Sequence, residues 1–189
     1  MSIALIESIA QEIEVCRACA LCDSAMRAVP GEGPANAAVM LIGEAPGSAE
    51  DRSGRPFVGA SGRLLDRLLR CAGLDRDGVF IANVVKHRPP DNRDPTPAEI
   101  HACQPFLRRQ IAAIDPRVIV PLGRHAAKYW IPTIQIALQH GTVFRVEGRL
   151  VVPMFHPAAA LYQRRNLPLL EADFAQLGVF LRDGFPAQS

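Results

Sequence analysis

Four short runs of apolar residues stand out along the chain. They cover residues 38–43, 79–85, 117–123 and 150–155, and each is nearly continuous in aliphatic side chains. Runs of this length and composition are typical of strands buried on both faces, as in a parallel sheet. We therefore expect four strands, with the connecting segments packed over the faces of the sheet.

The segments around these runs carry the periodicity of helices. Aliphatic residues recur at helical spacing over residues 2–14, and four leucines predict a helix over 63–74. Thr96 and Glu99 have the spacing of a capping box, which predicts a long helix after them, and a last helix is expected over 167–181. Strands alternating with helices predict an α/β fold, a three-layer sandwich with a central four-stranded, mostly parallel sheet flanked by helices.

The composition is that of an ordinary globular protein. Of the 189 residues, 49% are hydrophobic and 21% are charged, which argues against disorder and fits a single domain over residues 1–189. The longest uncharged stretch, residues 129–144, is interrupted by Pro132 and Gly141, so no segment is expected to span a bilayer. Acidic residues stand near the N-terminus where a secretory signal would be basic, which favours a cytoplasmic protein.

The net charge says little about partners. It is +2 at pH 7, which is too balanced to indicate a polyanionic partner. Lys86 and Lys128 are lysines and the remaining basic residues are all arginines. This bias fits bidentate phosphate binding, but a GC-rich genome would produce it equally well, and both explanations stay open here.

The loops that follow the expected strands carry unusual polar sequence. They read GEAPG, KHRPPDNR, GRHA and HPAAALYQRR, in chain order. Because parallel strands end at the same edge of a sheet, these loops are expected to meet there, and α/β folds bind ligands at that edge. The sequence therefore predicts one site built from four loops.

Four residues of these segments suit a planar polar ligand. Phe57, in a glycine-rich loop, offers a stacking surface or simply plugs the core. Asn83 carries a donor and an acceptor, which could read an edge such as N3–H and O4 of a pyrimidine or bond a neighbouring loop. Glu44 is either a site carboxylate or a turn residue, and His156 either polarises a carbonyl or makes an ordinary hydrogen bond. Their shared placement, more than any one of them, predicts a site.

The other histidines and the isolated cysteine lack this context. His101, His125 and His140 are expected to be structural, and Cys71 is expected to be a small buried residue on the leucine-rich helix.

The remaining cysteines suggest part of a metal site. Five cysteines are an odd number, which argues against a disulfide framework. Cys16, Cys19 and Cys22 form C-x2-C-x2-C, a spacing typical of half of a metal or iron–sulfur site. Such a half-site needs partners from elsewhere in the chain.

Five stretches of the chain, taken together, resemble the iron–sulfur uracil-DNA glycosylases of family 4. They occur in the family's order and span most of the chain. They are VPGEG (29–33), IGEAPGSAEDRSGRPFVGASGRLLD (42–66), NVVKHRPPDNRDPTPAEIHAC (83–103), PRVIVPLG (116–123) and FHPAAAL (155–161). The resemblance implies a central four-stranded parallel sheet between helices, which agrees with the pattern of apolar runs.

The resemblance also implies a base-flipping enzyme. Such enzymes rotate the target nucleotide out of the helix, and cleavage leaves negative charge on uracil and cationic character on the sugar. Phe57 would stack on the flipped ring, Asn83 would read its Watson–Crick edge and His156 would face O2. Glu44 would stabilise the sugar or orient water, since Ala45 stands where another branch has an aspartate base. The implied catalytic residues are Glu44, His156 and Asn83, and the implied substrate-binding residues are Gly43, Glu44, Ala45, Phe57, Asn83 and His156.

The DNA-binding residues are implied in the same way. Backbone amides at the start of a helix would hold a phosphate, and the segment after His156 would fill the gap left by the extruded base. The residues concerned are Gly59, Ser61, Gly62, Leu161, Tyr162 and Arg164. We expect a monomer that acts on uracil-containing DNA, single- and double-stranded, with no membrane partner.

At one cluster position the chain departs from the family. Three of the family's four cluster cysteines are matched, whereas the position in K-H-R-P-P holds a histidine, which can also ligate iron. The resemblance then implies a structural [4Fe–4S] cluster that holds residues 1–28 against the rest of the domain. Cys22 as the fourth ligand, a zinc ion, or no metal remain as alternatives. The implied ligands are Cys16, Cys19, His87 and Cys103.

Three functional alternatives remain beside uracil excision. A related branch with K-H traps DNA covalently through a histidine in a basic insertion, but the loop PPDNRDP is short and has no histidine. The same fold could prefer hypoxanthine or xanthine. A catalytically inactive nucleic-acid-binding metal module is the alternative from a different class, although it would not require Glu44, Phe57, Asn83 and His156 together.

Overall fold

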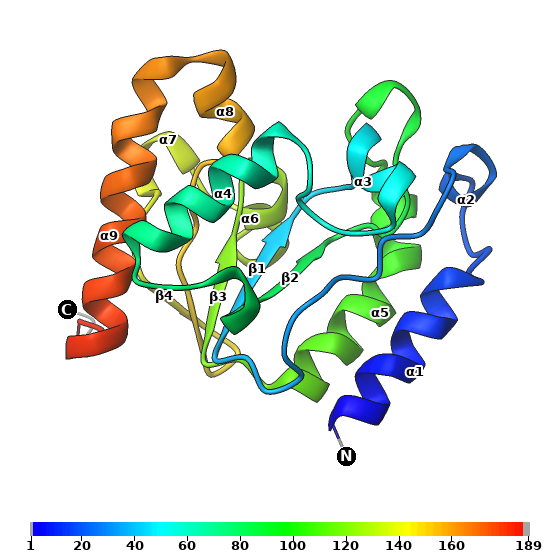
Figure 1. The fold of residues 1–189 in the computed structure, drawn as a ribbon, viewed down its shortest axis with the longest axis horizontal. Coiled ribbons are helices and arrows are strands. Elements are labelled where there is room, and N and C mark those ends of the chain that lie inside the picture. Colours follow the sequence, from blue (N-terminus) through cyan, green and yellow to red (C-terminus); the bar gives the residue numbers. More distant parts are fainter. Residues whose placement is uncertain (1, 187–189) are drawn as a thin grey trace.

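In the computed structural model, which describes residues 2–186, a five-stranded sheet forms the centre of the fold (Figure 1). The strand order is β2-β1-β3-β5-β4, and β1, β2, β3 and β5 run parallel. These four strands coincide with the four apolar runs, which confirms that part of the prediction. The strands are β1 (Val39–Gly43), β2 (Phe80–Asn83), β3 (Val118–Pro121), β4 (Phe144–Val146) and β5 (Arg149–Val151).

The expectation of four strands is wrong by one. β4 lies at the sheet edge and pairs antiparallel with β5 across a two-residue turn. Both turn residues, Glu147 and Gly148, have positive φ, at 50° and 78°, as tight hairpin turns require. β4 has only three residues, so alternation could not reveal it in the sequence. β5 ends at Val151, and the apolar run predicted as strand continues only through a parallel bridge between Leu122 and Met154.

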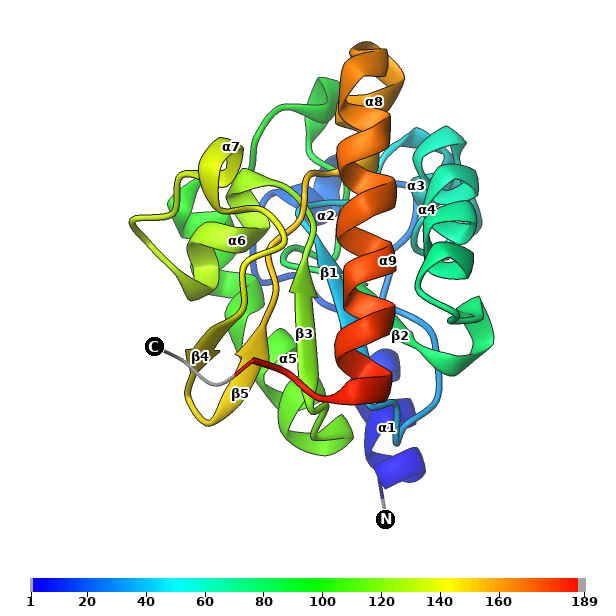
Figure 2. The same ribbon diagram turned by 90° about the vertical axis from the view of Figure 1, so that its left-hand side faces the viewer.

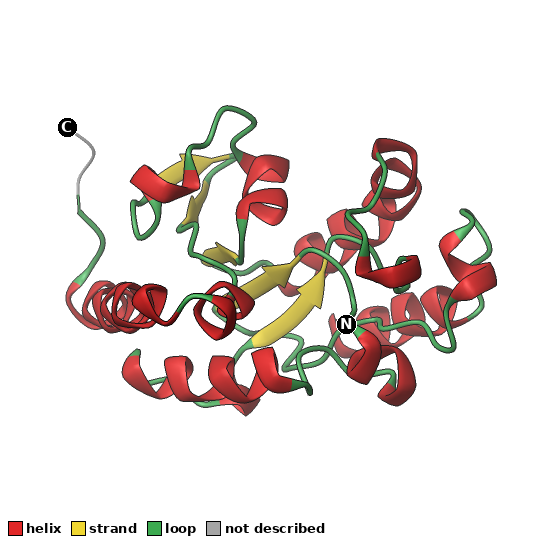
Figure 3. Ribbon diagram, turned by 90° about the horizontal axis from the view of Figure 1, so that it is seen from above, coloured by secondary structure: helices red, strands yellow, loops and turns green. Residues whose placement is uncertain are grey.

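Helices cover both faces of this sheet, which gives the expected three layers (Figures 1 and 3). One layer contains α4, α8 and α9, with α9 running along its outside (Figure 2). The opposite layer contains α5 and α6, and α1 packs against α5. The helices are α1 (Ser2–Glu14), α2 (Leu21–Ser24), α3 (Ser48–Ser53), α4 (Ala60–Cys71), α5 (Pro97–Ile114), α6 (Arg124–Trp130), α7 (Ile136–Gln139), α8 (Pro157–Tyr162) and α9 (Leu167–Asp183).

The strands feed both layers because successive side chains point to opposite faces. Leu41 and Val120 pack with the leucines of α4 and α9, whereas Met40 and Ile119 pack with the apolar face of α5. All four are fully buried. This two-sided burial explains why the strands read as continuous apolar runs.

The helix predictions hold for the long helices and fail for the short ones. The capping box is present, since Thr96 Oγ1 accepts from Glu99 N at 3.3 Å and Glu99 Oε2 accepts from Thr96 N at 2.7 Å. By contrast, α3 lies in a segment expected to be loop, and α6, α7 and α8 were not predicted. Within the described residues, no helix combines the length and apolarity needed to cross a bilayer.

The N-terminal segment docks through ordinary side-chain contacts. Ile9 and Ile13 are fully buried and form a small cluster with Ala28. On the surface, both Glu12 carboxylate oxygens accept from Arg109 of α5, each at 2.6 Å. These contacts fix α1 to α5 without the help of a metal.

Candidate active site

The carboxyl ends of the parallel strands and the loops after them meet at one edge of the sheet, at the top of Figure 1. A cavity of about 330 Å³ opens there. It brings together seven of the residues singled out in the sequence, and Gly43 lies directly beneath two of them. The seven are Glu44, Ala45, Phe57, Ser61, Asn83, His156 and Tyr162.

Asn83 ends β2 and is buried, with 1% of its surface exposed. Its Oδ1 has no hydrogen-bond partner among the described residues, which is costly for a buried amide unless a ligand supplies one. Gly43, paired with it at the end of β1, makes room for this side chain. A Cβ on Gly43 would lie 2.3 Å from Asn83 Oδ1 and 2.7 Å from Phe57 Cζ.

Phe57 is both a core residue and a wall of the cavity. Only 6% of its surface is exposed, yet its ring lines the cavity and lies 5.6 Å, centroid to centroid, from the tilted ring of His156. Its φ is 50°, a left-handed conformation that is unusual for a bulky residue. The planes of the two rings are inclined by 32° to each other, and together they offer a surface for a planar ligand.

His156 is the N-cap of α8, and this fixes which ring nitrogen carries the proton. Its Nδ1 accepts a hydrogen bond from Ala158 N at 3.1 Å, so in the neutral ring the proton is on Nε2. Burial lowers the pKa of His156 to about 4, while nearby Glu50 opposes the shift. The ring is therefore neutral at pH 7 and presents one N–H donor.

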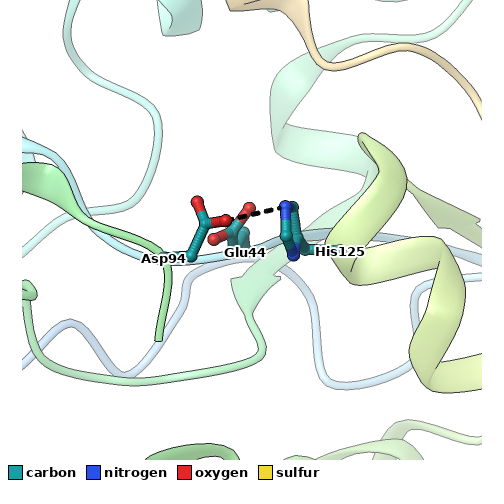
Figure 4. Close-up of side chains that lie close together, drawn as sticks. All are labelled: Glu44, Asp94 and His125. Carbon is teal, nitrogen blue, oxygen red and sulfur yellow. Dashed lines mark ion pairs between the residues drawn. The ribbon is translucent and has the colours of Figure 1, made fainter. Parts of the chain in front are cut away.

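Glu44 follows β1 and lies in a group of charged side chains that the sequence did not predict (Figure 4). One oxygen or nitrogen of each of Glu44, Asp94 and His125 lies within 4.8 Å of the others, and His125 Nε2 is 3.1 Å from Asp94 Oδ2. Burial raises the pKa of Glu44, which His125 lowers and Asp94 raises further. The guanidinium of Arg124, 3.1 Å from His125 Nε2, makes this a charge network rather than a cage for a cation.

The residues expected to be structural lie in different surroundings. His125 lies close to Glu44, whereas His140 pairs with Asp173 at 2.7 Å and His101 is exposed on α5. Cys71 was expected to be buried but is exposed, because it lies on the outer face of α4.

Glu50 of α3 is the main site residue that sequence reasoning missed. It lines the cavity, and its Oε1 accepts hydrogen bonds from Val58 N and Gly59 N, each at 2.9 Å. The signal was present, since Glu50 stands three residues after Gly47 at a helix start, where a capping carboxylate is common. Other lining residues not predicted are Pro46, Gly47, Pro89, Asn92, Arg93 and Ala158.

The predicted phosphate-binding amides need one correction. Gly59 N already donates to Glu50, so it is not free for a phosphate. Gly62 is buried, and a Cβ there would lie 1.7 Å from Phe57 O, so its smallness is required by packing. Ser61, in the first turn of α4, is the one of the three that lines the cavity.

The predicted wedge residues lie at the rim and point to solvent. Leu161 and Tyr162 end α8 with 49% and 88% of their surfaces exposed, and Arg164 follows in an exposed short turn. Of these three residues, Tyr162 also lines the cavity.

The predicted cluster ligands come from three segments of the chain. Cys16 and Cys19 lie in the loop between α1 and α2, His87 follows β2, and Cys103 is in the second turn of α5. Burial raises the pKa of the Cys103 thiol, and Cys19 and Cys16 raise it further. Cys22, the alternative ligand, is buried on α2 and also acts on the pKa of Cys19.

The chemistry of this donor set, three thiols and one imidazole, fits an iron–sulfur cluster and is also compatible with zinc. Lys86 N donates to Cys103 Sγ at 3.4 Å, a contact that favours a thiolate. The Lys86 ammonium is fully buried and has only neutral acceptors, Asn83 O and Gln110 Oε1, so anionic ligands beside it would compensate its charge.

Comparison with known proteins identifies the family. The family model described as "Uracil DNA glycosylase superfamily" matches residues 30–178. A type-4 uracil-DNA glycosylase of Sulfurisphaera tokodaii is 45% identical over 184 residues, covering 91% of this chain and 83% of that protein. The type-4 enzymes of Archaeoglobus fulgidus (42% identical, 92% of each chain) and Thermotoga maritima (41% identical, 86% of each chain) are similar as well. The chain therefore belongs to the uracil-DNA glycosylase superfamily and, within it, to the type-4 enzymes.

Proposed function

We propose that this chain removes uracil from DNA by hydrolysing the bond between the base and its deoxyribose. The observation that carries the proposal is the convergence of Glu44, Phe57, Asn83 and His156 on one cavity at the sheet edge. A binding module would need a surface, but it would not need a buried amide without a partner beside a neutral histidine donor.

The cavity suits a flipped pyrimidine. The Phe57 ring offers a stacking face, and the Asn83 amide supplies both a donor and an acceptor for the N3–H and O4 edge. A uracil in this position satisfies the Asn83 oxygen that has no partner in the protein. Cytosine presents the opposite donor and acceptor pattern on that edge, so the amide also contributes to selectivity.

His156 stabilises the leaving group. When the N-glycosidic bond breaks, its electron pair moves onto uracil, and the negative charge is shared between N1 and the carbonyl oxygens. The Nε2–H of neutral His156 donates to O2 without giving up its proton, because burial makes the charged ring unfavourable. The bond from Ala158 N holds the donor in place before the reaction begins.

Glu44 acts on the sugar. Its carboxylate, at the end of β1, stabilises the cationic sugar and orients the water whose oxygen forms the new bond to C1′. The proton that the water loses passes through the solvent to the uracil anion, and the products are free uracil and an abasic site. Burial raises the pKa of Glu44, whereas His125 and Arg124 beside it lower the pKa and so favour the charged carboxylate.

The partner is uracil-containing DNA, single- or double-stranded, bound by a monomer. Leu161 and Tyr162 enter the space left by the base, and Arg164 contacts a phosphate nearby. Their exposure beside the cavity supports this role. Flipping costs a few kcal/mol, and the wedge offsets part of that cost by stacking on the neighbouring bases.

A [4Fe–4S] cluster is proposed as a structural cofactor. Cys16, Cys19, His87 and Cys103 would hold it, and it would tie the segment before β1 to the loop after β2 that ends at the active site. Hydrolysis needs no electron transfer, so the cluster supplies rigidity rather than a chemical step. Burial lowers the pKa of His87, which keeps the imidazole neutral and able to ligate.

Alkaline cleavage of an oligonucleotide that carries one uracil tests the proposal. Asn83→Asp and His156→Ala should each lower the single-turnover rate by about 10²–10³-fold, because each removes a donor aimed at the developing charge. Matched controls on exposed positions, Asn36→Asp and His101→Ala, should behave like wild type. Unchanged rates in both site variants would refute the proposed site, and an inactive wild-type protein that still binds DNA would favour the binding module. Oligonucleotides with hypoxanthine or xanthine, run in parallel, test the shifted base preference.

A further inference from the structure

The loop that carries Phe57 is held by hydrogen bonds along four consecutive residues. We call residues 56–59 the Phe57 strap. Each of its four consecutive residues gives one backbone group to a charged side chain that lies outside the strap. The carbonyls of residues 56 and 57 are bound to Arg76, and the amides of residues 58 and 59 are bound to Glu50.

Arg76 holds the carbonyl half and is itself immobilised. It lies in a short turn, Arg76–Gly78, before β2, and donates to Phe57 O at 3.0 Å and to Pro56 O at 2.5 Å. Its remaining donors bind Glu32 Oε1, at 2.9 and 2.6 Å, and Asp66 Oδ1 at 3.0 Å. The planar guanidinium is thus fixed in one orientation by groups from three segments.

Glu50 holds the amide half from the other side. Its Oε1 accepts from Val58 N and Gly59 N, while Oε2 accepts from Gly47 N at 3.2 Å, which anchors the carboxylate to the start of its own helix. A cation therefore binds the strap's carbonyls and an anion binds its amides. Each charge is matched to the backbone dipole that it meets.

The strap needs this support because Phe57 has an unfavourable backbone. A φ of 50° in a bulky residue costs about 1–3 kcal/mol and persists only where the surroundings impose it. Gly62 allows the first turn of α4 to approach Phe57 O, since any side chain there would collide with that carbonyl. Without the hydrogen bonds, the strap would relax to an ordinary conformation and the ring would turn away from its present position.

We propose that Arg76 is a positioning residue for base recognition, fixing the Phe57 ring in its stacking orientation while Glu50 secures the other half of the strap. The inference rests on the proposed function, because it assigns the ring to the flipped base. Arg76 does not line the cavity, so it acts on the base only through Phe57. Arg76 would therefore affect binding of the base without touching it, by fixing the conformation of the Phe57 strap.

Arg76→Gln removes the guanidinium that binds both strap carbonyls, and Arg55→Gln is the matched control. Arg55 binds the same Glu32 carboxylate, at 2.8 and 3.4 Å, but its side chain makes no hydrogen bond to the strap carbonyls. Both variants, Phe57→Ala, and the double variant Arg76→Gln/Phe57→Ala are compared in kcat/KM on a uracil oligonucleotide. Inhibition by free uracil and thermal stability are measured on the same proteins.

We expect Arg76→Gln to lower kcat/KM by about 10–100-fold, as a displacement of about 1 Å at a reacting site does. It should also weaken inhibition by free uracil as Phe57→Ala does, whereas Arg55→Gln stays near wild type. In the Phe57→Ala background, Arg76→Gln should have almost no further effect, since two residues that act through one contact are not additive. A merely structural role would lower stability without this non-additivity.

Additive losses, or an Arg76→Gln variant no weaker than Arg55→Gln in uracil inhibition, would overturn the inference. If Arg76→Gln does not fold, Arg76→Lys replaces it, because lysine keeps the charge but has three donors where Arg76 uses five in a planar group. A folded Arg76→Lys variant with wild-type uracil inhibition would also overturn it. If the wild-type protein excises no uracil, the proposed function itself fails, and the inference with it. Failure of the Arg76 variants alone leaves the proposed function standing.

Discussion

Gly43 offers a direct test of the site, because one methyl group there should disable it. Its backbone does not have a positive φ, so alanine introduces no backbone strain. The added Cβ would lie 2.3 Å from Asn83 Oδ1 and 2.7 Å from Phe57 Cζ, whereas ordinary contacts begin at 3.4 Å. The amide and the ring must therefore move by about 1 Å, which is enough to lower a reaction rate about 10²-fold.

The assay is the single-turnover cleavage of a uracil oligonucleotide by Gly43→Ala, with thermal unfolding measured in parallel. Overpacking the end of β1 should cost about 1–3 kcal/mol of stability, so the variant should fold. Gly78→Ala is the matched control, since a Cβ there meets nothing within 4 Å and the position has no positive φ. A Gly43→Ala enzyme with wild-type kcat/KM would refute the assignment of Asn83 and Phe57 to the base-binding wall.

Further predictions concern pH, metal and covalent trapping. The pKa of His156 is about 4 in the folded chain against an ordinary 6.5, so unfolding takes up a proton between these values. Stability should therefore fall by up to about 3 kcal/mol as pH drops from 6.5 to 4, and His156→Gln should abolish this component of a pH series of denaturant unfolding. His125→Ala removes the larger of the two neighbours that lower the pKa of Glu44, leaving Arg124, which lowers it, and Asp94, which raises it, so the acid limb of kcat/KM should move to higher pH; a limb at the wild-type position would contradict this. Protein purified without oxygen should show the broad visible absorption of an iron–sulfur cluster and lose thermal stability when the cluster is removed, whereas zinc and a colourless protein would contradict the cluster. No covalent protein–DNA band should appear on a denaturing gel, and such a band would contradict simple hydrolysis. If the band were lost in His125→Ala, His125 would be the nucleophile that traps the DNA.

The sequence predicted those parts of the fold that depend on repeated local signals. The four parallel strands were predicted because burial on two faces makes each a continuous apolar run, and the long helices because burial on one face imposes a period over many residues. β4 escaped detection because three residues carry no period, and its hairpin uses Glu147 at positive φ instead of the usual Asn or Asp. The helices of four to seven residues were missed for the same reason.

The site divides along a similar line. Asn83 stood out as a polar residue inside an apolar run, and His156 as a polar residue directly after one. Glu50, Asp94 and His125 did not, because their importance depends on which loops fold back over the sheet edge, and that is a tertiary property. Each looks like an ordinary surface residue in the sequence.

The charges around the cavity also come partly from residues that the sequence pattern indicated and partly from residues that only the fold brings there. Glu44 and His156 both line the cavity, and their pKa values are shifted in opposite directions, because burial raises the pKa of the Glu44 acid and lowers that of the His156 base. Burial keeps His156 neutral, which suits a donor to an anion, but burial also raises the pKa of Glu44, whose proposed role needs the charged form. His125 and Arg124, on a helix that no pattern predicted, oppose that shift. A motif can therefore supply the chemical groups of this site, while the fold supplies the charges that set their protonation.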